Sequence, residues 1–87
     1  MALCVSLIRV ADFDVWREVY DSAAPLRASG GVTAESVHRM AGDPDNVLVI
    51  SHFDSVAAAQ AFFANPDLLD AMERAGVKAE RRIEFYD

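Results

Sequence analysis

The chain has 87 residues and a mass of 9.5 kDa, so it holds a single small domain over residues 1–87. Hydrophobic side chains make up 53% of the residues, and a domain this small buries only about 60% of its unfolded surface. The formal charge of −6 argues against nucleic acid or an anionic membrane as a partner. Part of the apolar surface is therefore expected to line a pocket or to contact another chain.

Other features of the composition narrow the class further. Cys4 is the single cysteine, which excludes an internal disulfide and a zinc ribbon. The segment Met1–Arg9 has no basic start and no long apolar run, so we expect neither a signal peptide nor a membrane span. We place the protein in the cytoplasm. Because no phosphate loop or metal-ligand spacing is present, we expect no cofactor and no bound metal.

The first half of the chain predicts a strand followed by a helix. Ala2–Val10 is rich in apolar and β-branched residues at both alternating positions, as in a buried strand. Asp12 is a typical N-cap, and aromatic and apolar residues follow it at helical spacing. A helix over about residues 12–29 is predicted, with a kink or restart at Pro25.

The second half predicts a hairpin, a broken helix and a last strand. Thr33–Met40 and Val47–Phe53 read as strands joined by a six-residue loop. A helix starts at Asp54–Ser55 and runs to Phe63, and Asn65–Pro66 starts a new helix that Gly76 ends. Glu80–Tyr86 alternates charged and apolar residues, as a strand does.

The order strand–helix–strand–strand–helix–strand is that of the ferredoxin-like plan. This α+β fold places a four-stranded antiparallel sheet under helices that cover one face only. The other face needs a cover, and the sheet of a second copy would supply it. We therefore expect a homodimer.

Several segments together resemble small actinobacterial proteins of the dimeric α+β barrel superfamily, described as cyclases or antibiotic-biosynthesis-monooxygenase-like proteins. The resemblance covers about residues 3–86, and it implies a homodimeric barrel with a cavity between each sheet and its helices. An apolar small molecule, aromatic or polyketide-like, is the ligand that it implies. The resembling segments are Val10–Trp16, Ser36–Arg39, Asp43–Val47, Phe53–Ser55 and Ala61–Phe63.

The two histidines are the first candidates for catalysis, because imidazole exchanges protons near neutral pH. If the hairpin strands pair Met40 with Val47, Glu35 lies opposite His52. A carboxylate there would hold the imidazole and raise its basicity. The same register puts His38 on the other face of the sheet, and an odd slip of the register would exchange the two faces.

Three further residues are candidate ligand contacts, each with a purely structural alternative. Trp16 could stack on a planar ligand or pack in the core beside its aromatic neighbours. Phe62 could stand at a pocket rim or in a helix core. Arg39 could anchor an acidic or phenolate ligand, although a solvated or ion-paired arginine is the common case.

These residues support two classes of function. The first is an enzyme without a cofactor that performs proton transfer (enolisation, cyclisation or isomerisation) with His52 or His38 as base and Glu35 in support. Substrate-assisted oxygenation is the nearest relative of this chemistry. The second is a non-catalytic dimeric module that binds a ligand or assists assembly.

Overall fold

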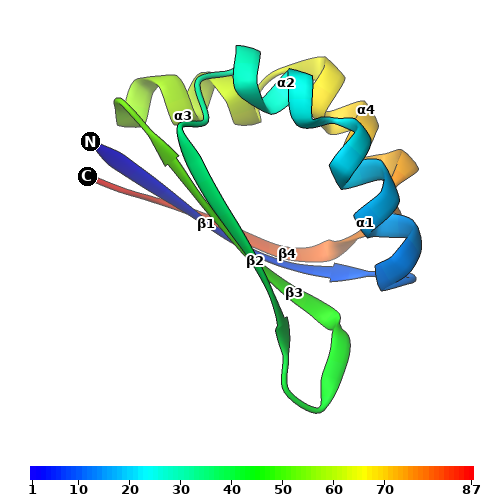
Figure 1. The fold of residues 1–87 in the computed structure, drawn as a ribbon. Helices are drawn as coiled ribbons and strands as arrows, with labels where there is room; N and C mark the ends of the chain where they lie inside the picture. The colour runs from blue at the N-terminus through cyan, green and yellow to red at the C-terminus, as the bar shows by residue number, and fades with distance from the viewer.

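The computed structural model describes all 87 residues, and its element order is β-α-α-β-β-α-α-β (Figure 1). Neighbouring strands in the sheet, in the order β2-β3-β1-β4, are antiparallel, and all helices lie on one face (Figure 1). The predicted ferredoxin-like fold is confirmed. The elements are β1 (Ala2–Val10), α1 (Phe13–Ser22), α2 (Ala24–Ser29), β2 (Ala34–Met40), β3 (Asp43–Phe53), α3 (Val56–Phe63), α4 (Pro66–Arg74) and β4 (Val77–Tyr86).

Side-chain caps fix where the helices begin. Asp12, Ser55 and Asn65 each accept hydrogen bonds from backbone N–H groups in the first turn of α1, α3 and α4. The helix predicted over residues 12–29 is two helices, because the chain leaves helical geometry at Ala23 and Pro25 opens α2. None of the helices has the length and apolar character needed to cross a bilayer.

The central strand β1 separates two different faces of the sheet. Its even-numbered residues are buried beneath the helices, while Leu7 on the opposite face is 39% exposed. We call this opposite face the open face, because no helix covers it (Figure 1). Its centre is an apolar patch, because the residues that meet there across β1 and β3 are Leu3, Val5, Leu7, Leu48 and Ile50.

The β2–β3 hairpin differs from the prediction. A tight turn at residues 41–42, with Gly42 at φ +84°, replaces the six-residue loop, and β3 begins at Asp43. Arg39 pairs with Val47, and Met40 pairs with Asp43 across an irregularity. The predicted pairing of Met40 with Val47 is therefore wrong by one residue, which exchanges the two faces of β2.

The hydrophobic core consists of two clusters rather than one. Between them, at helix-facing positions, lie two small polar residues, Ser6 of β1 and Ser51 of β3, both buried. One cluster contains Ile8, Val10, Trp16, Val47, Val49 and Ala75, and the other contains Ala2, Cys4, Phe53, Ala59 and Phe62. Gaps between buried groups are rare in close-packed interiors, so this division needs an explanation.

Gly30 gives a test of the packing at the second cluster. It has ordinary right-handed geometry, but an added Cβ would overlap the ring carbon Cδ1 of buried Phe62. We expect Gly30→Ala to lower the free energy of unfolding by about 1–3 kcal/mol, as overpacking does. Denaturant titration measures this, with exposed Ala28→Ser as the control that stays within about 0.5 kcal/mol. A Gly30→Ala variant as stable as the parent would contradict the packing described.

Candidate functional site

A cavity of about 80 Å³ lies between the sheet and the helices. Thirteen of its sixteen lining residues are hydrophobic, and its aromatic walls are Trp16, Tyr20, Phe62 and Phe63. A single water molecule needs only about 10–15 Å³. We call this space the helix-side cavity. Its apolar, aromatic lining with a few polar groups has the character of a small-molecule site, but its volume is below the roughly 300–1,000 Å³ of typical ligand pockets. An aromatic ligand therefore enters only if the surrounding side chains or helices move apart.

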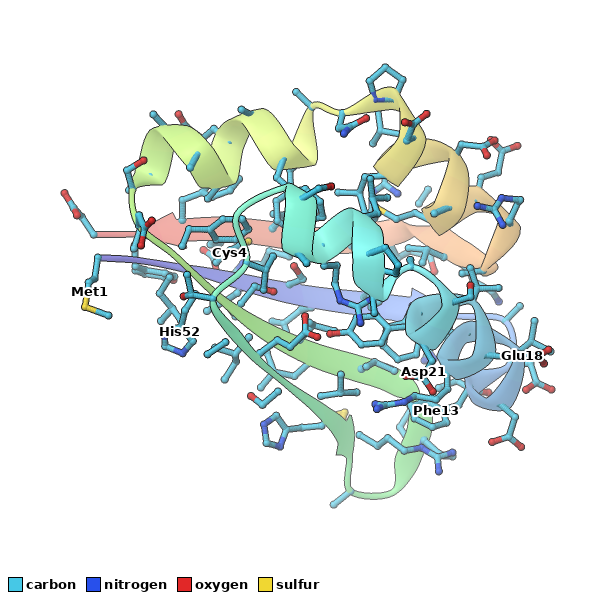
Figure 2. The ribbon with its side chains drawn as sticks, turned by 45° about the horizontal axis from the view of Figure 1, so that its top comes forward. Met1, Cys4, Phe13, Glu18, Asp21 and His52 are labelled. Carbon is cyan, nitrogen blue, oxygen red and sulfur yellow. The ribbon has the colours of Figure 1, made fainter.

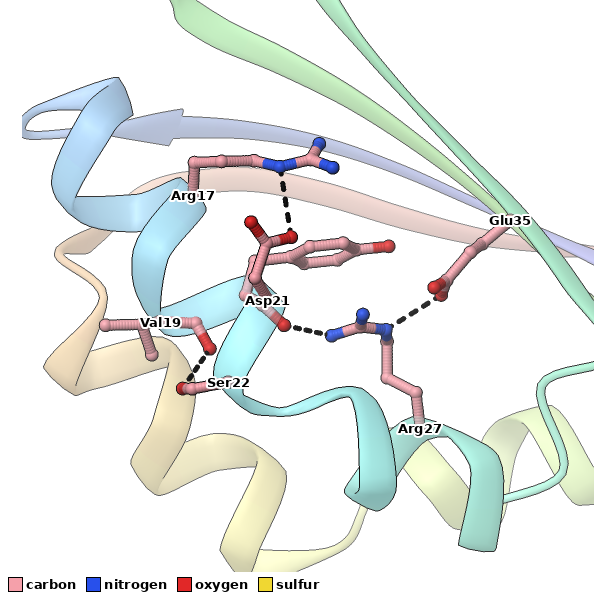
Figure 3. A network of polar contacts seen from close by, with 7 residues as sticks. Arg17, Val19, Asp21, Ser22, Arg27 and Glu35 are labelled. Atoms are coloured by element: carbon pink, nitrogen blue, oxygen red, sulfur yellow. Dashed lines mark hydrogen bonds and ion pairs between the residues drawn. The ribbon is translucent and has the colours of Figure 1, made fainter.

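Arg27 is the charged residue of this cavity, and its side chain is held from three sides (Figure 3). Its Nε donates a hydrogen bond to Oε2 of Glu35 at 2.8 Å, which joins α2 to strand β2. Its Nη1 donates to the backbone carbonyl of Tyr20, and its guanidinium carbon lies 3.7 Å from the centre of the Tyr20 ring. A buried guanidinium is stable only with such partners, so its position is fixed.

The hydroxyl of Tyr20 is buried and has no hydrogen-bond partner. Its ring stacks on Trp16, with 4.8 Å between the ring centres. Burial raises the pKa of Tyr20 to about 12; the Arg27 charge opposes this shift and the Glu35 carboxylate adds to it. The phenol therefore stays protonated at neutral pH and remains a hydrogen-bond donor.

Cys4 and Ser6 lie side by side on the helix-facing side of β1. The Cys4 Sγ atom is 3.8 Å from Oγ of Ser6, and burial raises the pKa of the Cys4 thiol. A thiol of this kind is not a nucleophile at neutral pH. Cys4 is thus a small buried strand residue.

Trp16, Phe62 and Glu35 lie on the helix side of the sheet. Trp16 and Phe62 line the helix-side cavity, so each is in a position to contact a ligand. Glu35 is opposite Ser51 in the strand pairing and binds Arg27. The predicted pair of Glu35 with His52 is wrong, because the irregularity between Arg39 and Met40, next to the hairpin turn, moves the register of the rest of β2 by one residue from the predicted one.

Both histidines lie on the open face. His52 pairs with Leu3 of β1 and points away from the helices (Figure 2). His38 pairs with Leu48, and its Nε2 is 3.1 Å from Oγ of Ser36. The prediction that the two imidazoles occupy opposite faces is wrong, because it assumed a register of β2 and β3 that differs from the observed one by one residue. Neither histidine lines the helix-side cavity.

Arg39 lies outside the helix-side cavity. Its guanidinium carbon is 3.9 Å from the centre of the Phe13 ring, and its Nε donates to the carbonyl of Pro44 at 3.2 Å. Together with His38 it lines a wide depression of about 650 Å³ at the hairpin end of the sheet. We call this depression the hairpin-end hollow.

Sequence reasoning did not identify Arg27, Ser51 or the role of Tyr20. Arg27 reaches back over Tyr20 only because the chain breaks between α1 and α2, and helical spacing alone does not show this. Ser6 and Ser51 did leave a signal. A serine at a helix-facing position of an otherwise apolar strand indicates space or a polar partner above it.

The two tyrosines permit a direct test of the buried phenol. We expect ultraviolet absorbance of tyrosinate to show a transition near pH 12 that Tyr20→Phe removes. Because the folded pKa is raised, its stabilising contribution is complete below the ordinary pKa near 10. That contribution is lost as the pH rises toward 12. Tyr86→Phe is the control and is expected to keep the transition. If Tyr86→Phe removed the transition and Tyr20→Phe kept it, the assignment to Tyr20 would be contradicted.

No family model matches the sequence. No curated protein matches it either. Among solved structures, SnoaB, a cofactor-independent oxygenase from Streptomyces nogalater, is similar with a TM-score of 0.81 at 13% identity, over 99% of this chain and 90% of that one. A protein described as an antibiotic biosynthesis monooxygenase from Bordetella bronchiseptica gives 0.82 at 13% identity, over 99% and 94%.

A third similar structure is a dimeric protein of unknown function with a ferredoxin-like fold from Bacteroides fragilis. Its TM-score is 0.73 at 18% identity, over 99% of this chain and 94% of that one. At sequence identities this low, the structural similarity establishes the fold but not the reaction. The chain therefore has the ferredoxin-like fold, as the resemblance in its sequence predicts.

Proposed function

We propose that the protein is a small-molecule enzyme that binds an apolar, electron-rich aromatic compound in the helix-side cavity. The observation that carries this proposal is the cavity itself, which combines aromatic walls with an unpartnered hydroxyl and one guanidinium. The structural similarity to SnoaB, described as a cofactor-independent oxygenase, supports this class of chemistry.

Substrate-assisted oxygenation is the reaction that we assign to this cavity. A bound hydroxyarene loses its phenolic proton, and the phenolate donates an electron to O2. A carbon–oxygen bond forms at a ring C–H position, and loss of water from the hydroperoxide leaves a quinone. One hydroxyarene and one O2 thus give one quinone and one water. The Arg27 guanidinium favours the phenolate, since opposite charge stabilises the ionised form.

Proton transfer without oxygen is the second reaction that this environment suits. An enolate formed during cyclisation or isomerisation also places negative charge on an oxygen, which the same cation stabilises. His38 and His52 stay candidate bases only for a substrate in the hairpin-end hollow or elsewhere on the open face. Binding without turnover, as in a non-catalytic module, is the alternative to both reactions.

Oxygen uptake with a dihydroxynaphthalene tests the location of the reaction. Ser51→Leu fills the floor of the helix-side cavity, so we expect kcat/KM for quinone formation to fall at least about tenfold. A double variant, His38→Ala with His52→Ala, is expected to stay within about twofold of the parent. If Ser51→Leu left kcat/KM unchanged and the double histidine variant lowered it, the reaction would take place on the open face instead. Ligand-induced stabilisation with no quinone would favour the binding module.

We also propose that two copies associate through the open face. The apolar patch at its centre joins five apolar residues of two neighbouring strands, and contiguous apolar patches mark interfaces. The similarity to a dimeric ferredoxin-like protein supports this arrangement. The resulting dimer would cover the sheet on both sides.

Sedimentation tests the dimer at micromolar concentration. The parent is expected at twice 9.5 kDa. Leu7→Asp puts a charge into the covered face and should weaken association by about a hundredfold or more. Leu69→Asp changes a similarly exposed leucine, on α4, and should leave the mass unchanged. A monomeric parent would overturn the proposal.

A further inference from the structure

We infer that the Tyr20 hydroxyl recognises the substrate by donating a hydrogen bond to a carbonyl or phenolate oxygen held in the helix-side cavity. This inference rests on the proposed function and names the substrate class more closely. A hydrocarbon would fill the same space, but only an oxygen acceptor would satisfy the donor in its wall.

The first observation is that the donor has no partner. The Tyr20 oxygen is fully buried, and no protein atom accepts from it at hydrogen-bond distance. Buried polar groups are almost always paired in native structures, and an unpaired one is a mark of function or of a missing ligand. Tyr20 lines the helix-side cavity, so a molecule bound there can supply the acceptor.

Glu35 is the one protein group that competes for this role. Its carboxylate raises the tyrosine pKa both through its charge and as a hydrogen-bond acceptor close to the phenol. However, its Oε2 accepts from Nε of Arg27 at 2.8 Å, and the phenol makes no hydrogen bond of ordinary geometry to the carboxylate. Glu35 and a bound ligand are therefore the two candidate acceptors, and the experiment below separates them.

The second observation is that the ring is held in place. Trp16 stacks on the Tyr20 ring at 4.8 Å, and the Arg27 guanidinium carbon lies 3.7 Å from its centre. Arg27 is in turn fixed by Glu35 and by the Tyr20 carbonyl. A donor held in advance by packed neighbours loses little freedom when a ligand arrives. Arg27 is thus a positioning residue for the phenol.

Two probes of nearly equal size and shape test the inference. Acetophenone carries a carbonyl that only accepts hydrogen bonds, and ethylbenzene has no acceptor. Nuclear magnetic resonance titration of the parent is expected to give about tenfold tighter binding of acetophenone. Tyr20→Phe should bring the two dissociation constants within about twofold, while Tyr86→Phe keeps the preference. Arg27→Met should reduce the preference for acetophenone, because the phenol loses the group that positions its ring.

Thermal unfolding without ligand supplies an independent readout. Because Tyr20→Phe removes a buried donor that nothing satisfies, we expect a melting temperature equal to or above that of the parent. If Tyr20→Phe had a lower melting temperature and kept the preference for acetophenone, the inference would be overturned, and the hydroxyl would instead be a hydrogen-bond donor to Glu35. Equal binding of both probes by the parent overturns the inference alone. Failure of both probes to bind overturns the proposed cavity as well.

Discussion

Ser6 of β1 and Ser51 of β3 stand at helix-facing positions that a continuous core would fill with larger side chains. Each is flanked along its strand by residues of the two hydrophobic clusters, so the pair divides the core in two. The helix-side cavity lies above this division, with Arg27 and Tyr20 in its wall. Large apolar residues at these two positions would join the clusters and remove the site. The candidate site thus depends on a break in the packing that two small polar residues produce.

The elements of the fold could be predicted from local chemistry, whereas the register could not. Asp12, Ser55 and Asn65 marked the helix starts because capping depends on a few adjacent residues. The stretch from Asp43 to Asn46 has the composition of a loop, yet it belongs to β3. The pairing of this stretch with β2 contains an irregularity between Arg39 and Met40. Because side chains alternate with a period of two, this irregularity places residues 34–39 of β2 on the opposite face from the predicted one.

The candidate site followed from the sequence only in part, for a related reason. Trp16 and Phe62 were identifiable because helical spacing shows which aromatic residues face the sheet. Glu35 was identified with the wrong partner, since its face depended on the register. Arg27 could not be assigned, because its return over Tyr20 follows from the angle between α1 and α2. That angle is a property of packing, which no short sequence pattern records.

The divided core and the open face belong to one energetic argument. A chain of 87 residues buries a modest share of its surface, and a cavity with an unpaired phenol reduces the stability gained from that burial. Association through the apolar patch would stabilise the folded state by mass action, since only the folded sheet presents that patch. The proposed dimer therefore offsets the cost of the proposed site. The open face would then contribute to function by restoring stability that the cavity removes from the core, even though no residue of the helix-side cavity lies on it.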